Sequence, residues 1–256
     1  VLNADRCEIY TDVDGIYTTD PRVHTGAARL ATVSHDEMLE LASLGAGVMH
    51  SRSIEFAKKF GVPIFVRSSF EDGPGTEISS GSTSRRTVSG VALAKDEARV
   101  TVEDVPDQPG ASHQLFAELS SNGISVDMII QNAGTGGTAD ISFTVTNQDV
   151  PAALEITNSV AERLRAAGVT HDPDVAKVSI VGSGMVNAEG VAATMFDALS
   201  AAKINVHMIT TSEIKVSVLV DRKNAQKSVE AAHKAFGLDG FVDERLPTDS
   251  TPVQKS

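Results

Sequence analysis

The sequence predicts a mixed fold, in which an α/β segment is followed by two α+β units with the same βαββαβ order. The main observation is an internal repeat whose matching positions lie 80 residues apart, as from Gly110 to Gly190. The other pairs are Phe116 with Phe196, Leu119 with Leu199, Ile124 with Ile204, and Met128 with Met208. One register spans a helix and a strand, so the repeat indicates two copies of a small domain that share an interface.

Composition narrows the class of protein. The chain has 256 residues, 41% of them hydrophobic and 22% charged, which is typical of globular domains. Its formal net charge of −12 disfavours binding to nucleic acid or to anionic membranes. Cys7 is the only cysteine and the seven histidines have no metal-ligand spacing, so we predict neither a disulfide nor a metal site. We expect a cytoplasmic protein without a membrane span.

The α/β segment starts with a predicted strand at 7–10, which leads into a polar turn. Ser34 and Glu37 form a capping-box pattern at the start of a predicted helix. A second helix is expected over about 47–60, with Gly61 as its C-terminal stop. Residues 63–68 then predict a short buried strand.

Each repeat predicts the same succession of elements. A strand (99–102 or 177–181) enters a loop that ends in glycine, and a helix with an apolar face follows. The next strand alternates strictly, with Ile124, Val126, Met128 and Ile130 on one face in the first copy. A hairpin strand, a second helix and a closing strand complete a ferredoxin-like βαββαβ unit.

Composition shifts mark the boundaries between these parts. The predicted divisions are an α/β segment over 1–77, a Gly- and Ser-rich linker over 78–86, repeat units over 87–170 and 171–246, and a disordered tail over 247–256.

The repeats resemble the ACT domain, a module that binds amino acids and regulates metabolic enzymes. The loop DQPG at 107–110 matches the Asp-x-Pro-Gly that opens the first ACT helix. Such a loop presents unpaired backbone N–H groups at a helix N-terminus, and these groups suit a carboxylate.

Three further stretches are similar to aspartokinases and follow one another in that family's order. CEIYTDVDGIYTTDPR at 7–22 resembles the nucleotide-binding segment of the amino-acid kinase domain. VSIVGSGM at 178–185 and ITTSEIKVSVLV at 209–220 resemble the second ACT unit. The resemblance implies transfer of the γ-phosphoryl group of ATP, bound with Mg²⁺, to L-aspartate, which gives 4-phospho-L-aspartate. It also implies feedback inhibition by L-lysine, L-threonine or both, in a homodimer or larger assembly joined through ACT units.

The resemblance assigns site residues position by position. The expected ATP contacts are Thr11, Asp12, Tyr17, Thr18, Asp20 and Arg22. The expected effector contacts in the first unit are Gly110, Ser125, Val126, Asp127 and Gln131. Those in the second unit are Val191, Ala192, Asn205, Val206 and Ser212.

The chain departs from the family pattern at several places. Many members have a lysine for the ATP phosphates where this sequence reads Gly45-Ala46-Gly47, and the second ACT loop, NAEG at 187–190, lacks the usual proline. No stretch matches the Lys-(Phe/Tyr)-Gly-Gly motif or the aspartate-binding residues, so we assign no catalytic residue to this chain. We expect a chain that starts inside the kinase domain and is inactive alone. The alternative is a regulatory subunit that senses amino acids without catalysis.

The residue patterns by themselves leave two simpler interpretations open. Asp12, Asp14 and Asp20 are also typical turn residues, particularly with Gly15 among them. The polar strand face that carries Asp127 and Gln131 also fits a solvated surface.

Overall fold

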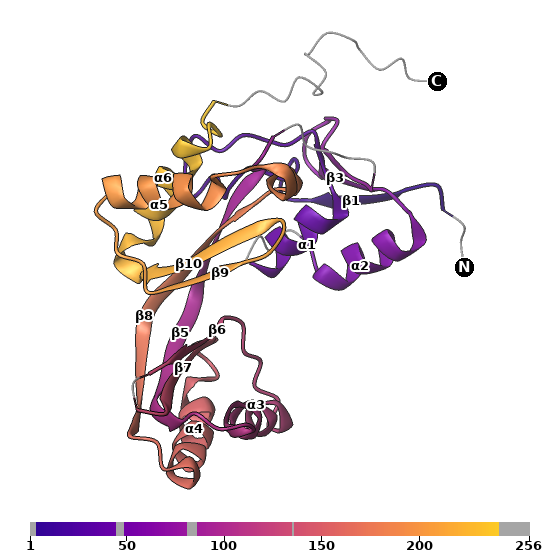
Figure 1. Ribbon diagram of the computed structural model, residues 1–256. Coiled ribbons are helices and arrows are strands. Elements are labelled where there is room, and N and C mark those ends of the chain that lie inside the picture. The colour runs from indigo at the N-terminus through magenta and orange to yellow at the C-terminus, as the bar shows by residue number, and fades with distance from the viewer. Residues whose placement is uncertain (1–3, 45–48, 81–85, 135, 241–256) are drawn as a thin grey trace.

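The computed structural model describes residues 4–44, 49–80, 86–134 and 136–240 (Figure 1). The predicted linker residues 81–85, the Gly45-Ala46-Gly47 stretch and the predicted tail 247–256 lie outside the described residues. None of the described helices is long and apolar enough to cross a membrane.

The N-terminal segment, here the described residues up to Ser80, contains a four-stranded sheet in the order β1-β3-β4-β2. The strands are β1 (Cys7–Thr11), β2 (Thr32–Val33), β3 (Ile64–Ser68) and β4 (Thr76–Ile78). The two helices are α1 (His35–Ser43) and α2 (Ser51–Phe60). β1 runs parallel to β3, so residues after the carboxyl end of β1 lie at an edge where ligands of α/β proteins commonly bind.

Local sequence accounts for the helix ends in this segment. The Ser34 side chain accepts a hydrogen bond from the Glu37 N–H, and the Glu37 carboxylate accepts one from the Ser34 N–H. This confirms the predicted capping box. Gly61 ends α2 at φ 66°, a left-handed conformation that costs glycine little, as the sequence predicts.

The remainder of the described chain forms a six-stranded sheet in the order β6-β7-β5-β8-β10-β9. Its strands are β5 (Gly90–Pro106), β6 (Ile129–Ala133), β7 (Thr138–Val145), β8 (Gly168–Val181), β9 (Met208–Thr211) and β10 (Lys215–Asp221). Its α-helices are α3 (Ala111–Ser121), α4 (Val150–Leu164), α5 (Val191–Ala201) and α6 (Ala225–Ala235). Two 3₁₀ turns, η1 (Ser183–Asn187) and η2 (Arg222–Asn224), complete it.

Two long strands run through both repeat units (Figure 1). The first part of β5 pairs with the last part of β8, from Gly90 opposite Val181 to Ala94 opposite Lys177. After an irregularity near Glu97, the rest of β5 pairs with β7 and with the first part of β8. We call the half built on 98–106, with α3, β6, β7, α4 and 168–172, unit 1. Unit 2 is the half built on 175–181, with α5, β9, β10, α6 and 90–94.

This pairing corrects the predicted organisation of the repeats. The sequence suggests that each unit supplies its own closing strand, and that unit 1 begins near residue 87. In the structure residues 90–94 occupy the position beside β8 where a closing strand of unit 2 would lie. Unit 1 is therefore inserted between the edge strand of unit 2 and the remainder of unit 2.

Each unit has a separate apolar core. The core of unit 1 includes Leu115, Phe143 and Val160, and that of unit 2 includes Ile180, Met195 and Val229. A small shared cluster of Met128, Val175, Met208 and Leu219 joins the units. Met128 and Met208 are equivalent in the repeat, which confirms that these positions serve as core.

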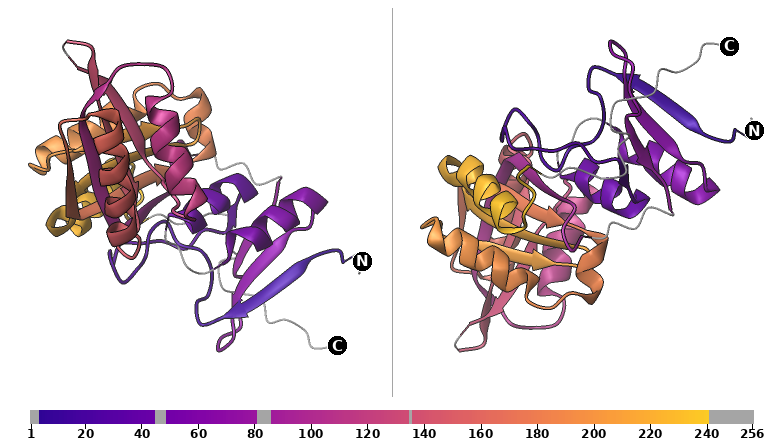
Figure 2. Two further views of the ribbon diagram at one scale, coloured as in Figure 1. Left: turned by 90° about the horizontal axis from the view of Figure 1, so that it is seen from below. Right: turned by 90° about the horizontal axis from the view of Figure 1, so that it is seen from above.

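The N-terminal segment packs beside unit 2 and lies to one side of the two repeat units in both views of Figure 2. Ala92 and Val181 of unit 2 belong to the same apolar cluster as Met38 and Ile54 of the segment. The Val91 N–H donates to the Thr18 carbonyl at 2.6 Å, so the edge strand of unit 2 is bound to the segment.

Candidate functional site

The first candidate site lies in the loop that follows β1. Thr11 ends the strand, and its hydroxyl donates to the Asp12 carboxylate at 3.0 Å. Further along the loop the Asp20 carboxylate accepts from the Arg22 Nε at 3.0 Å and from the Arg22 Nη2 at 2.9 Å. These bonds lower the pKa of Asp20, and the carboxylates of Asp20 and, to a lesser extent, Asp12 raise the pKa of Arg22. Hydrogen bonds and charge interactions therefore connect four of the predicted ATP contacts, namely Thr11, Asp12, Asp20 and Arg22.

The Arg22 side chain is 89% exposed despite its ion pair. Asp20 fixes one edge of the guanidinium, and the remaining N–H donors face solvent. A planar guanidinium in this state suits a phosphate oxygen.

Tyr17 lies on a second polar cluster of the same loop. Its hydroxyl donates to the Asp14 carboxylate at 2.8 Å, and the Arg29 Nη1 lies 3.2 Å from the other Asp14 oxygen. Burial and then the Asp14 hydrogen bond raise the pKa of Tyr17 to about 12, so the phenol stays protonated at neutral pH. Asp14 thus orients Tyr17, which is more than a turn residue does.

Thr18 does not fit its predicted role as an ATP contact. Its side chain is fully buried, and its hydroxyl accepts from the Ala28 N–H at 2.9 Å. The same hydroxyl lies 2.8 Å from the His233 Nε2 of unit 2. A nucleotide cannot reach this oxygen without unpacking the segment from unit 2, so Thr18 is a structural contact between them.

The second candidate site is at the start of α3 and β6 in unit 1. Gly110 caps α3 at φ 96°, and Ser112 in the first turn donates to the Gln131 Oε1 on β6 at 2.7 Å. Ser125, Val126 and Asp127 lie between these elements, where Val126 is half-buried and the other two are exposed. The structure thus brings Gln131 to the start of the helix that follows Gly110.

Asp127 forms an ion pair with a buried lysine, a contact that no local sequence pattern indicates. Its carboxylate forms an ion pair with the ammonium of Lys177 on β8, and the same ammonium contacts the Glu97 carboxylate at 2.6 Å. The Lys177 and Glu97 side chains are 5% and 9% exposed, whereas that of Asp127 is 50% exposed. Burial opposes the charged form of Lys177, but the two carboxylates outweigh it and raise its pKa. The predicted effector residue is therefore held by a buried internal cation.

In unit 2 the structure brings only some of the predicted effector contacts together. Asn205 and Val206 line a shallow groove with six neighbours, namely Phe196, Leu199, Ser200, Lys203, Ile204 and Ile209. Val191 is buried and Ala192 half-buried at the start of α5, after Gly190 at φ 79°. The Ser212 N–H donates to the Lys215 carbonyl at 2.8 Å, within the hairpin of β9 and β10 and outside the groove lining.

Sequence reasoning missed two groups of residues because their partners are distant in the chain. Glu37, predicted as a helix cap, also accepts from the Ser89 hydroxyl at 2.6 Å and the Ser183 N–H at 2.8 Å. In the described part of the chain, His24, His233 and Asp239 form a cluster of metal-ligating types, although metal spacing is absent from the sequence. No local pattern indicates either group.

Known protein families match the N-terminal segment and each of the two repeat units. The amino acid kinase family matches residues 1–68, and ACT domains match residues 99–162 and 178–236. The aspartate kinase Ask_LysC of Stutzerimonas stutzeri is 46% identical over 241 residues, which are 93% of this chain and 58% of that protein. The chain therefore spans less than two thirds of the length of this relative.

Solved structures of aspartokinases also match. The chain is 46% identical to one from a structure of aspartokinase alpha and beta subunits, over 58% of this chain and 98% of that one, with a TM-score of 0.55. Aspartokinase III of E. coli in complex with aspartate and ADP matches at 28% identity, over 91% of this chain and 53% of that one, with a TM-score of 0.76. The same enzyme in complex with lysine and aspartate matches over 92% of this chain and 53% of that one, at 28% identity and a TM-score of 0.73. The chain has an amino acid kinase segment and two ACT units, and it is 46% identical to an aspartokinase chain of which it covers 98%. The chain therefore belongs to the aspartokinase family.

Proposed function

We propose that this chain is the nucleotide-binding end and the regulatory half of an aspartate kinase. The complete enzyme transfers the γ-phosphoryl group of ATP to the β-carboxylate of L-aspartate and forms 4-phospho-L-aspartate. The observation that carries the proposal is the exposed Arg22 guanidinium, fixed by Asp20 beside Asp12 at the carboxyl end of β1.

Each loop residue has a defined part in nucleotide binding. Arg22 offers charge-assisted hydrogen bonds to phosphate oxygens, and Thr11 and the protonated Tyr17 offer hydroxyl groups for ribose or base. The exposed Asp12 carboxylate is an oxygen ligand of the kind that Mg²⁺ accepts, and Mg²⁺ neutralises phosphate charge when bound. Thr18 acts by holding the loop against unit 2.

Regulation is assigned to the ACT units. We propose that L-lysine, L-threonine or both bind between unit 1 and an ACT unit of a second chain, with Asp127 and Gln131 as contacts. β6 and β9 are the outer strands of the six-stranded sheet, and the equivalent residues Ile129 and Ile209 on them are 46% and 42% exposed. Open strand edges with exposed apolar side chains support association of two chains.

The effector site and the nucleotide site are coupled if the effector binds the active and inactive arrangements of the enzyme with different affinity. An effector that binds the inactive arrangement more tightly shifts the enzyme toward it, typically by about 1–3 kcal/mol. The contacts that join unit 2 to the kinase segment, at Glu37 and at Thr18, give such a shift a route to the nucleotide loop.

A non-catalytic regulatory subunit is the second candidate function. The match to a chain from a structure of aspartokinase alpha and beta subunits favours it, because 58% of this chain covers 98% of that one. Calorimetric titration with ATP and Mg²⁺, and then with L-lysine and L-threonine singly and together, separates the candidates. Binding of both nucleotide and effector supports the enzyme fragment, whereas effector binding without nucleotide supports the sensor.

Turnover provides the complementary test. We expect no aspartate-dependent ATP turnover from residues 1–256 alone, because no residue of the chain is assigned to aspartate binding. A hydroxamate assay for acyl phosphate checks this. Measurable product from the purified chain would contradict the assignment.

A further inference from the structure

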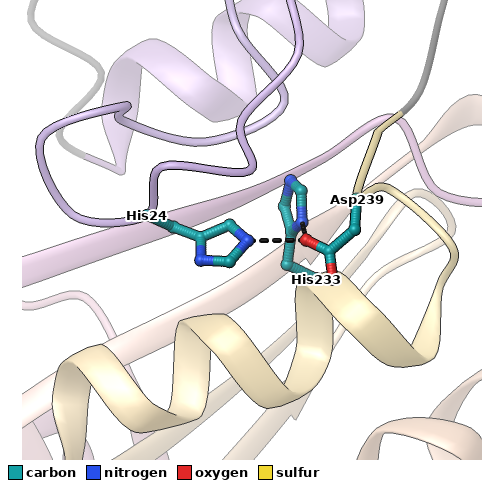
Figure 3. A group of neighbouring side chains, drawn as sticks. All are labelled: His24, His233 and Asp239. Carbon is teal, nitrogen blue, oxygen red and sulfur yellow. Dashed lines mark hydrogen bonds and ion pairs between the residues drawn. The ribbon is translucent and has the colours of Figure 1, made fainter.

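Three side chains from distant parts of the chain meet where the N-terminal segment contacts unit 2 (Figure 3). His24 comes from the loop between β1 and β2, His233 from the last turn of α6, and Asp239 from the residues that follow α6. The His24 Nε2 and the His233 Nδ1 both point at one oxygen of the Asp239 carboxylate, at 2.6 and 2.7 Å. This cluster shares no residue with the predicted nucleotide contacts or with either ACT site described above, although His24 lies on the same loop as those nucleotide contacts.

The chemistry of this cluster matches a known class of binding site. Each residue offers one ligand atom, and the three atoms lie within 4.8 Å of one another. Two imidazole nitrogens and one carboxylate oxygen form the ligand set of many zinc sites that keep a fourth position for water. The imidazole rings lie with centroids 4.6 Å apart at 62°, so their edges converge on the carboxylate and do not stack.

The two histidines of the cluster are shielded from solvent, whereas the carboxylate is open to it. The His233 side chain is fully buried and that of His24 is 17% exposed, which limits competition from water. The Asp239 side chain is 42% exposed, which leaves a path for an ion and for a coordinated water. The Thr18 hydroxyl hydrogen-bonds the other nitrogen of His233 at 2.8 Å, a contact of the kind that orients metal-binding imidazoles.

We propose that His24, His233 and Asp239 bind one divalent transition-metal ion of the zinc class, with water as the fourth ligand. The His233 ring then presents the Nδ1 lone pair and carries its proton on Nε2 toward Thr18. His24 presents the Nε2 lone pair and carries its proton on Nδ1. Both imidazoles therefore bind the ion in their neutral form, each through one lone pair.

Binding requires a small outward movement of the carboxylate. Zinc bonds of about 2.0–2.1 Å in a tetrahedron place ligand atoms roughly 3.3 Å apart, farther than the 2.6 and 2.7 Å hydrogen bonds of the cluster. Asp239 can supply this movement because it is the most exposed of the three. An ion held there would connect the nucleotide loop to α6 by bonds stronger than the hydrogen bonds it replaces.

The test uses calorimetric titration of the full chain with Zn²⁺, and Mg²⁺ as a hard-cation comparison. We expect one Zn²⁺ site, no Mg²⁺ site of comparable affinity at these residues, and a higher melting temperature with Zn²⁺. Co²⁺ should show the visible absorption of a tetrahedral site with nitrogen and oxygen ligands. His24→Gln and Asp239→Asn should each weaken Zn²⁺ binding at least about tenfold, the lower end of the losses seen when metal-site partners are removed.

A matched control removes a different histidine–carboxylate pair. The His207 Nε2 lies 2.8 Å from the Asp221 carboxylate in unit 2, so His207→Gln should leave Zn²⁺ affinity unchanged. Absence of a Zn²⁺ site, or equal losses in His24→Gln and His207→Gln, would overturn the proposal. Arg22→Ala should keep the Zn²⁺ site, which separates this proposal from the one for nucleotide binding.

Discussion

Glu37 and Ser183 are joined by two hydrogen bonds across the boundary between the kinase segment and unit 2. The Ser183 N–H donates at 2.8 Å and the Ser183 hydroxyl at 3.1 Å to the same Glu37 oxygen. Glu37 is fully buried and also belongs to the capping box of α1, so one carboxylate contacts both the start of α1 and the start of η1 after β8. One buried carboxylate therefore helps to align helix α1 with the ACT sheet.

Glu37→Gln should reduce the loss of folding stability that occurs as the pH falls into the acid range. Burial alone would raise the pKa of Glu37, but hydrogen bonds from Ser89, Ser183 and Ser34 outweigh burial and lower it. A lowered folded pKa gives stability that is complete above the unfolded value near 4.5 and is lost as pH falls through the folded pKa. Urea unfolding between pH 3 and 7 should show a steeper acid loss in wild type than in the variant, by about 1–3 kcal/mol overall.

Glu40→Gln is the matched control for that substitution. Glu40 pairs with Lys215 at 2.8 Å across the same boundary, but both side chains are over 20% exposed. We expect a loss below about 1 kcal/mol, as for other surface pairs. Equal acid profiles for wild type and Glu37→Gln would contradict the role of the buried carboxylate.

Arg22→Ala should weaken nucleotide binding with little effect on folding. Charge-assisted hydrogen bonds contribute about 1.5–3 kcal/mol, so the KM for ATP in the complete enzyme should rise about tenfold or more. Steady-state kinetics check this, with Arg52→Ala on α2 as an exposed control. An unchanged KM would remove Arg22 from the site.

Asp127→Ala and Gln131→Ala should relieve feedback inhibition more than they lower turnover. Loss of a coupling of about 1–3 kcal/mol raises the effector concentration for half-inhibition about fivefold or more, while kcat changes less than about twofold. Inhibition curves with L-lysine and L-threonine measure both quantities. Parallel losses of inhibition and turnover would argue against a regulatory site.

Lys177→Met should destabilise the junction between units. The substitution leaves the buried Glu97 carboxylate without its cation, and such losses cost about 3–5 kcal/mol. Denaturant unfolding gives the difference, and Lys215→Met, which breaks the partly exposed pair with Glu40, should cost below about 1 kcal/mol. If the two variants lose similar stability, the Lys177 pair is no more important than a surface contact.

Local features of this fold could be predicted from sequence because neighbouring residues determine them. The Ser34–Glu37 capping box, the stop at Gly61 and the alternating burial from Ile124 to Ile130 each depend on a few consecutive positions. The repeat likewise indicated both units.

Long-range pairing could not be predicted in the same way. Nothing in residues 90–94 shows that they join unit 2, because any short apolar strand satisfies that edge. The burial of Thr18 and the cluster of His24, His233 and Asp239 also depend on how the segment packs against unit 2. Resemblance to a family assigns positions but does not show which side chains are already occupied by internal partners, as Asp127 is by Lys177.

The two strands that both units share limit how unit 1 can move. β5 and β8 lie side by side from Glu103, opposite Gly168, to Gly90, opposite Val181, with irregularities only around Glu97 in their pairing. The paired strands β5 and β8 thus connect unit 1, at one end, to the Val91–Thr18 hydrogen bond with the N-terminal segment, at the other. A tilt of unit 1 that keeps the two strands paired would bend them near Glu97, which binds Lys177, or press their far end against the loop that follows β1.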